Sequence, residues 1–208
     1  MTEDERIRMY ARDAEQILLS SGHDKGRRHP FRSRSAHSMR VMKWAERLLP
    51  YHPEADREVL LCAAAFHDTG YAGEDRMDHQ KASAALFRKY AAEHGLDADF
   101  TEKTTGCIAI HSDKYRMAQP EQLSIEQLLL MEADLLDEEG ALSLCWDGLA
   151  CGVEGINSYE GAFDKTYLNM DAKRHNMLVT KEARAIWDEK ARFLELYVEQ
   201  MKRDLERY

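Results

Sequence analysis

The segment that most constrains the fold is an uninterrupted run of eight apolar residues, 59–66, which ends directly on His67 and Asp68. A helix that is apolar on every side is buried on every side, so this segment predicts the central helix of a helical bundle. The run is far shorter than the roughly 18 to 20 apolar residues that cross a bilayer. We therefore expect a packed interior, with two ionisable side chains at its edge.

The rest of the chain predicts an all-α fold. Apolar residues recur at three- and four-residue spacings, and no segment alternates with period two. Ser33 or Ser35 is expected to cap the second helix, which stops at Pro50, while Asp78 is expected to cap the fourth. Ser124 and Gln127 form a possible capping box. The predicted helices cover about 2–19, the segment up to Pro50, 57–68, 79–94, 99–111, 125–139, 159–170 and 180–208, with short helical turns over 141–157.

Composition predicts one compact domain, residues 1–208, or at most two small ones, in the cytoplasm. The chain is 44% apolar and 32% charged and has only 4 prolines, which excludes a disordered chain. No membrane contact is expected. The first residues are charged and lead straight into an amphipathic pattern, without the apolar core of a signal peptide.

The charge balance argues against a nucleic-acid polymer as partner. Net charge is −9, whereas phosphate backbones need clustered cations. One exception is the stretch from Lys25 to Arg34, which holds five basic residues and no acidic one. The 4 cysteines show no C-x-x-C spacing, so neither a structural zinc site nor disulfides are expected.

Several ionisable residues stand where a helical bundle would place apolar ones. Burying such groups without partners costs several kcal/mol. Histidines and aspartates on facing helices of a bundle commonly hold metal ions, because a cation compensates the carboxylates and neutral imidazoles supply nitrogen ligands. Each residue also has a plainer interpretation: the histidines as surface or core side chains, and Asp134 as a helix cap or an arginine partner. The candidates are His37, His67, Asp68, His79, His111 and Asp134.

The order and spacing of these residues resemble the HD-domain superfamily of metal-dependent phosphohydrolases. His37 matches the first histidine, the segment A-F-H-D-T-G carries the signature pair His67 and Asp68, and E-A-D-L-L-D carries the distal aspartate, Asp134. The tail is similar, more weakly, to that of small bacterial HD hydrolases. The resemblance implies an HD-domain helical bundle with a metal-binding core at about 30–140 and a C-terminal helical extension at about 141–208.

The resemblance also implies the ligands. One ion would be held by His37, His67, Asp68 and Asp134; His79 and His111 match the extra histidines of dinuclear members, with Asp68 bridging two ions. Four neutral imidazoles and two carboxylates around two divalent ions leave a formal charge of about +2, which suits a phosphate and a hydroxide. Nitrogen and oxygen ligands without thiolate point to Fe, Mn, Co, Ni or Zn and leave the native metal open.

The expected activity is hydrolysis of a small anionic phosphorylated substrate such as a nucleotide, by metal-activated hydroxide attack at phosphorus. Beside the catalytic Asp68, Lys114 and Arg34 are the first candidates for cations that face the substrate, although Lys114 could equally be a solvated loop lysine. A polyphosphate tail could be contacted by Arg27, Arg28 and Arg32, and a leaving-group acid could come from Glu74, Asp75 or Asp78. Where many members of the superfamily carry a lysine after the signature glycine, this chain carries Tyr71.

Two other functions fit the same residues. The ligand set also resembles the diiron HD oxygenases, which act on a small polyol or a phosphonate. A ligand-binding HD module without catalysis is the third possibility, although a module freed from catalysis need not keep all the ligands. The exposed side of the last predicted helix could be solvated or could associate in a homo-oligomer.

Overall fold

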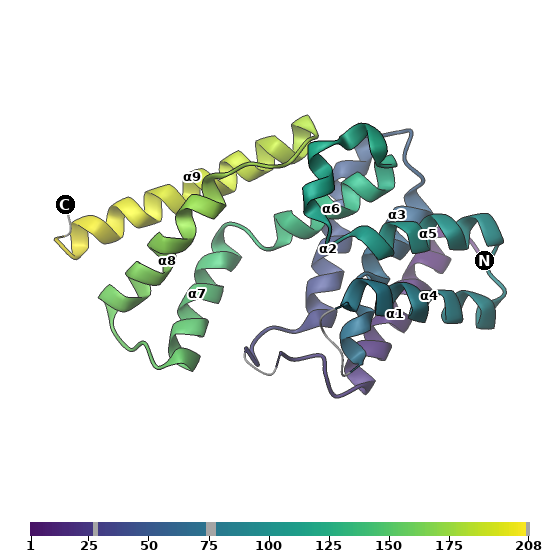
Figure 1. Ribbon diagram of the computed structural model, residues 1–208, viewed down its shortest axis with the longest axis horizontal. Coiled ribbons are helices and arrows are strands. Elements are labelled where there is room, and N and C mark those ends of the chain that lie inside the picture. Colours follow the sequence, from purple (N-terminus) through teal and green to yellow (C-terminus); the bar gives the residue numbers. More distant parts are fainter. Residues whose placement is uncertain (27–28, 74–77, 207–208) are drawn as a thin grey trace. The chain divides into compact units, whose positions relative to one another are not determined.

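A computed structural model describes residues 1–26, 29–73 and 78–206, apart from the side chains of 171–174 (Figure 1). Every regular element among these residues is a helix, and the isolated backbone bridge there joins Lys25 and Ser33. The expected all-α fold is therefore confirmed. The candidate residues Arg27, Arg28, Glu74 and Asp75 lie outside the described part of the chain.

The chain divides into two compact units, Met1–Asp134 and Leu135–Tyr208. The first contains α1 (Glu3–Ser20), α2 (Arg34–Leu48), α3 (Arg57–Phe66), α4 (His79–His94), α5 (Ala98–Ile110) and most of α6 (Ile125–Asp137). Short 3-10 turns η1 (Leu49–Tyr51), η2 (Thr69–Ala72), η3 (Lys114–Ala118) and η4 (Pro120–Gln122) connect them.

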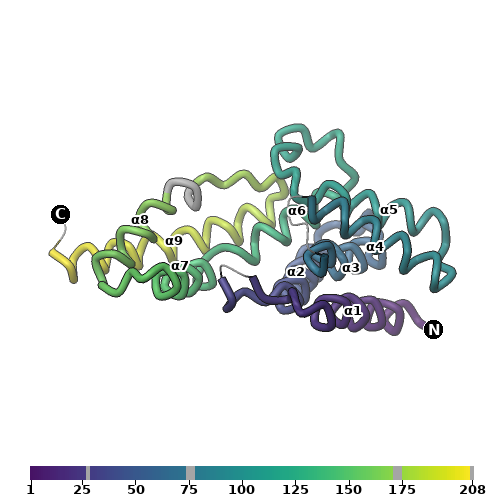
Figure 2. The backbone as a smooth tube through the Cα atoms, turned by 60° about the horizontal axis from the view of Figure 1, so that its bottom comes forward, coloured from purple at the N-terminus to yellow at the C-terminus, as the bar shows by residue number. Residues whose placement is uncertain are grey.

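Helix α3 is the central helix of the first unit, as its apolar run predicts. It contacts α1, α2, α4 and α5, which surround it in Figure 2, and every residue from Val59 to Phe66 is buried. The ring of Phe66 lies 5.2 Å from Phe87 and 4.8 Å from Tyr90, centroid to centroid. This aromatic cluster fixes α3 against α4, and so fixes the position of the residues that follow Phe66.

Helix α3 ends at Phe66, two residues before the predicted end. His67 keeps helical backbone angles, but Asp68 has φ −103° and ψ 5°, and the chain then turns into η2. The turn lies against the start of α4: a Cβ on Gly70 would stand 2.1 Å from the carbonyl oxygen of His79. The Gly70 amide donates to the Ser83 hydroxyl at 2.7 Å. Glycine is therefore required at this position for the close approach of the two segments.

Two of the predicted helix caps are confirmed and one is wrong, although the helix that it should cap begins at His79 as predicted. Ser33 caps α2 by accepting from the Ala36 amide, and Thr180 caps the last helix. Ser124 and Gln127 form the expected capping box, each amide donating to the side chain of the other residue. Asp78 makes no capping hydrogen bond to α4 and accepts instead from the Lys81 ammonium at 3.3 Å.

The second unit contains α7 (Ala141–Glu154), α8 (Tyr159–Arg174) and α9 (Lys181–Asp204). Helix α7 is one continuous helix, where sequence predicted short turns, and α8 extends past the predicted end at Met170. The apolar core of this second unit consists of Phe163, Met170, Leu194 and Val198. Among the described residues, no helix is long and apolar enough to cross a membrane.

Candidate metal centre

The six candidate ligands come together in the first unit, where the ends of several helices meet. His37 lies in the first turn of α2, and His67 and Asp68 directly follow α3. His79 is the first residue of α4, His111 directly follows α5, and Asp134 belongs to α6. Helix α3 delivers its two residues from the interior of the bundle, and the other helices surround them.

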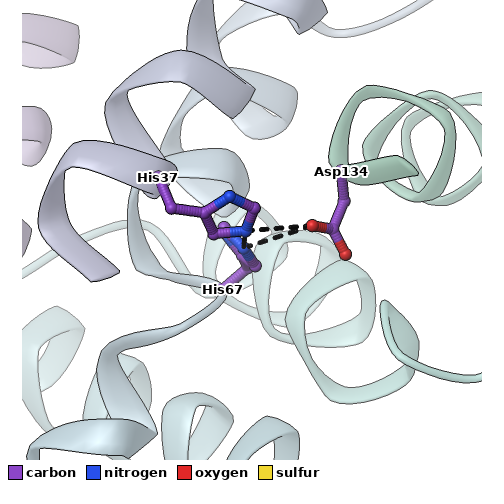
Figure 3. Close-up of side chains that lie close together, drawn as sticks. All are labelled: His37, His67 and Asp134. Atoms are coloured by element: carbon purple, nitrogen blue, oxygen red, sulfur yellow. Dashed lines mark hydrogen bonds and ion pairs between the residues drawn. The ribbon is translucent and has the colours of Figure 1, made fainter. Parts of the chain in front are cut away.

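The first group of ligand atoms comes from His37, His67 and Asp134, whose side chains point toward one another in Figure 3. The His37 Nε2 lies 3.0 Å from the Asp134 Oδ1 and 3.4 Å from the His67 Nε2. The His67 Nε2 lies 4.0 Å from the same carboxylate oxygen. All three side chains are buried or nearly so, and one divalent ion fits between atoms spaced in this way.

The second group comes from His79, His111 and Asp68. The Nε2 atoms of His79 and His111 lie 3.3 Å apart. The Asp68 Oδ1 lies 3.4 Å from the His79 Nε2 and 3.6 Å from the His111 Nε2. These spacings match those of the first group, so the structure brings together both sets of ligands that the sequence suggested.

Asp68 lies between the two groups and faces both. Its Oδ1 points to the second group, and its Oδ2 lies 3.8 Å from the His37 Nε2 of the first. The His67 Nε2 is 3.6 Å from the Oδ1. Asp68 therefore lies within 3.8 Å of imidazole nitrogens from both groups and could contribute a ligand to either.

Two of the imidazoles are held in the tautomer that a metal ligand requires. The Nδ1 of His67 lies 2.8 Å from the carbonyl oxygen of Ala64, and the Nδ1 of His111 lies 2.8 Å from that of Ile108. A carbonyl oxygen only accepts, so each Nδ1 carries the proton and each neutral ring keeps a lone pair on Nε2. Backbone carbonyls one helical turn earlier thus aim both Nε2 atoms at the carboxylates.

Burial keeps two of the histidines neutral. It lowers the pKa of His67 from 6.5 to about 4, against the opposing effect of the Asp68 carboxylate. It lowers the pKa of His79 to about 4 in the same way. At neutral pH both rings are therefore uncharged, which is the form that binds a metal ion.

The two aspartates are ionised although they are shielded from water. Burial is the largest single effect and disfavours their charged forms, but the surrounding groups together outweigh it, with His67 contributing most for Asp68 and Lys114 most for Asp134. Both pKa values are held well below the ordinary carboxyl range. Neutral imidazoles and ionised carboxylates form a donor set that fits divalent transition metals.

Both predicted substrate-facing cations lie beside this centre. The Arg34 Nη1 is 3.2 Å from the Asp68 Oδ2. The Lys114 Nζ is 2.7 Å from the Asp134 Oδ2 and donates to the Met131 carbonyl oxygen at 3.1 Å. Each cation touches a carboxylate oxygen of the centre, so positive charge is available where an anionic group would approach the ligands.

Tyr71 is held between two site residues. The Arg34 guanidinium lies 3.7 Å above the centre of the Tyr71 ring. The Tyr71 and His79 rings are stacked, with centroids 4.3 Å apart and planes inclined by 19°. Both faces of Tyr71 are thus covered, and its aromatic ring positions a cation and a candidate ligand at the same time.

Sequence reasoning missed one residue at the centre, Ser112. Its Oγ lies 3.1 Å from the Nε2 of His79 and 3.1 Å from the Nε2 of His111. The signal available in the sequence was weak, because a serine directly after a candidate histidine is common in any loop. Its position depends on the turn that the chain makes between the end of α5 and η3.

Comparisons with known proteins give one family match. The model of the HD domain matches residues 34–139, which include all six candidate ligands. Compared by sequence with curated proteins, the chain has no match.

Solved structures with the same fold come from several bacteria. A Bacillus thuringiensis HD-superfamily hydrolase shares 21% identity over 100% of both chains, with a TM-score of 0.73. Bacillus subtilis YpgQ, solved in complex with ADP, shares 21% identity over 98% of this chain and 97% of its own, with a TM-score of 0.68. A predicted HD-superfamily hydrolase from an uncultured Thermotogales bacterium shares 18% identity over 99% of both chains, with a TM-score of 0.66. At these identities the likeness establishes the fold.

Proposed function

The chain belongs to the HD-domain family, and on that premise we propose that it is a metal-dependent phosphohydrolase acting on a small phosphorylated substrate. The observation that carries the proposal is the position of Asp68. Its carboxylate lies within 3.8 Å of imidazole nitrogens from both groups, and the Arg34 guanidinium lies against its Oδ2. A bridging carboxylate with an adjacent fixed cation is suited to phosphoryl transfer.

In this proposal His37, His67 and Asp134 hold one ion, His79 and His111 hold a second, and Asp68 contributes to both. Divalent ions held by these residues would supply Lewis acidity toward a phosphoryl group and would lower the pKa of a bound water molecule. The protein supplies the orientation: the carbonyls of Ala64 and Ile108 fix two of the rings before any ligand arrives. The metal-binding core is then about residues 30–140, and the helical extension, about 141–208, supplies none of these ligands.

The cations of the site favour a negatively charged substrate. Arg34 and Lys114 each contact a carboxylate of the centre and are placed to bind phosphate oxygens as charge develops in the reaction. Burial and, after it, the neighbouring Arg34 cation lower the pKa of Arg32, whereas the Asp68 carboxylate raises it. Three cations near one centre favour an anionic substrate such as a nucleotide. The ADP complex of the structurally similar YpgQ supports the same choice.

The test is phosphate release from a panel of nucleoside mono-, di- and triphosphates and an aryl phosphate, with the chain loaded with Mn²⁺ or Co²⁺. We expect metal-dependent release that falls more than about 100-fold in Asp68→Asn, beyond the 10- to 100-fold typical of groups that only support a ligand. Asp99→Asn is the matched control, because Asp99 is an exposed carboxylate on α5 that pairs with Lys103 and has no role in the proposed site.

Two outcomes would overturn the proposal. A chain that binds its metal and releases no phosphate from any member of the panel is not a phosphohydrolase of this class. Oxygen consumption by the iron-loaded chain with a polyol or a phosphonate would instead establish the oxygenase chemistry that the same ligand set resembles.

A further inference from the structure

The hydroxyl of Ser112 has a position in the centre that the ligand assignment does not use. It lies 3.1 Å from the Nε2 of His79 and 3.1 Å from the Nε2 of His111. Those two nitrogens are themselves 3.3 Å apart, so the three atoms form a nearly equilateral triangle. A fourth atom, the Asp68 Oδ1, lies near this triangle, 3.4 Å from the His79 Nε2 and 3.6 Å from the His111 Nε2.

These spacings are those of atoms that share one metal ion. With metal–donor bonds of about 2.1 Å, neighbouring donors at octahedral to tetrahedral angles lie about 3.0 to 3.4 Å apart. The distances from the Ser112 Oγ to both nitrogens fall inside this interval. The hydroxyl is thus spaced from the two imidazoles as a fellow ligand would be.

A hydrogen-bond chain through Ser112 is the competing explanation. The His111 Nδ1 donates to the Ile108 carbonyl, so the neutral His111 ring has only a lone pair on Nε2 and accepts the single Ser112 proton. The contact with His79 is then favourable only if the His79 Nε2 carries its own proton and donates to the Ser112 oxygen. That tautomer would remove the His79 Nε2 from the ligands, and the two explanations therefore make opposite predictions about metal binding.

We propose that the Ser112 hydroxyl is an additional ligand of the ion held by His79, His111 and Asp68. The inference rests on the proposed metal-dependent function and adds a donor to that site. A neutral hydroxyl contributes a hard oxygen without further negative charge, so it favours ions that accept oxygen ligands, such as Mn²⁺, over those that prefer sulfur. The side chain is half-buried, and it reaches the centre from the turn directly after α5.

The experiment uses the Co²⁺-loaded full chain and the variant Ser112→Cys. A thiolate bound to Co²⁺ gives a sulfur-to-metal charge-transfer band in the near ultraviolet, which nitrogen and oxygen ligands do not give. The parent chain corrects for its native cysteines, and Tyr115→Cys is the matched control, because Tyr115 is 69% exposed and lies on η3. We expect the band in Ser112→Cys alone.

A second variant, Ser112→Ala, measures the contribution of the hydroxyl. We expect the affinity for the second ion to fall about tenfold while the first ion is retained, as judged by competition with a chelator. A parent-like affinity for both ions, together with no new band in Ser112→Cys, would overturn the assignment. If the assignment of Ser112 fails in this way but the parent holds two ions and releases phosphate, the proposed function stands without Ser112. If the parent binds no ion, the assignment of Ser112 and the proposed function both fail.

Discussion

Replacing His67 by asparagine in the metal-free chain should make the free energy of unfolding depend less on pH. His67 is fully buried, and burial lowers its pKa from 6.5 to about 4. Between these values the unfolded chain binds the proton and the folded chain does not. The free energy of unfolding must therefore fall as the pH is lowered through this window.

The size of the effect follows from the two pKa values. Each pKa unit corresponds to about 1.36 kcal/mol, so the change from 6.5 to about 4 amounts to about 3 kcal/mol between pH 7.5 and pH 4. Asparagine can keep the hydrogen bond that the His67 Nδ1 donates to the Ala64 carbonyl, but it has no titrating group. The cavity left by the smaller side chain costs stability equally at every pH.

The measurement is denaturant unfolding of both proteins, with a chelator present, at several pH values from 7.5 to 4. The quantity of interest is the difference in unfolding free energy between parent and variant. We expect this difference to shrink by about 3 kcal/mol toward pH 4, in favour of the variant. A difference that stays constant within about 1 kcal/mol would show that His67 is not held neutral by burial.

Substitutions at three further positions test how the centre is built. Gly70→Ala places a methyl group 2.1 Å from the carbonyl oxygen of His79. We therefore expect the free energy of unfolding, measured with denaturant, to fall by about 1 to 3 kcal/mol. An undiminished unfolding midpoint would contradict the close approach. Lys114→Ala should raise KM about tenfold in the phosphate-release assay while leaving metal content unchanged, because its ammonium contacts the Asp134 Oδ2, whereas the Oδ1 faces the imidazoles. Loss of metal would show that Lys114 supports the ligands. Tyr71→Phe keeps the stacking on His79 and should bind metal as the parent does. Tyr71→Ala should bind one ion about 10-fold more weakly, as measured by competition titration. Equal affinities in the two variants would refute a positioning role for the ring.

Much of the fold could be predicted from local pattern. The apolar run before His67 predicted a central helix, and spacing predicted most helix bounds within a residue or two. The end of α3 was placed two residues too late, because the turn at Asp68 depends on the contact of Gly70 with α4, which no local pattern encodes. Asp78 has the residue type of a helix cap, but its side chain pairs with Lys81 instead.

The candidate metal centre, like the fold, could be predicted only in part from the sequence. The ligand candidates were recognisable because an ionisable group in an apolar helical pattern needs a partner, and the structure brings all six together. Ser112 and the stacking of Tyr71 between Arg34 and His79 were not recognisable. Both depend on how turns at the ends of α3 and α5 approach α4, and hence on long-range packing rather than on residue type.

The most direct test of the account is the number of metal ions bound per chain, measured by elemental analysis after anaerobic purification and again after reconstitution. We expect two ions in the parent and one in His79→Ala, because His79 belongs to the second group alone and the first group is complete without it. One ion in both proteins would make His79 and His111 substrate contacts instead of ligands. No ion in the parent, even after reconstitution, would contradict the metal centre and the function proposed from it.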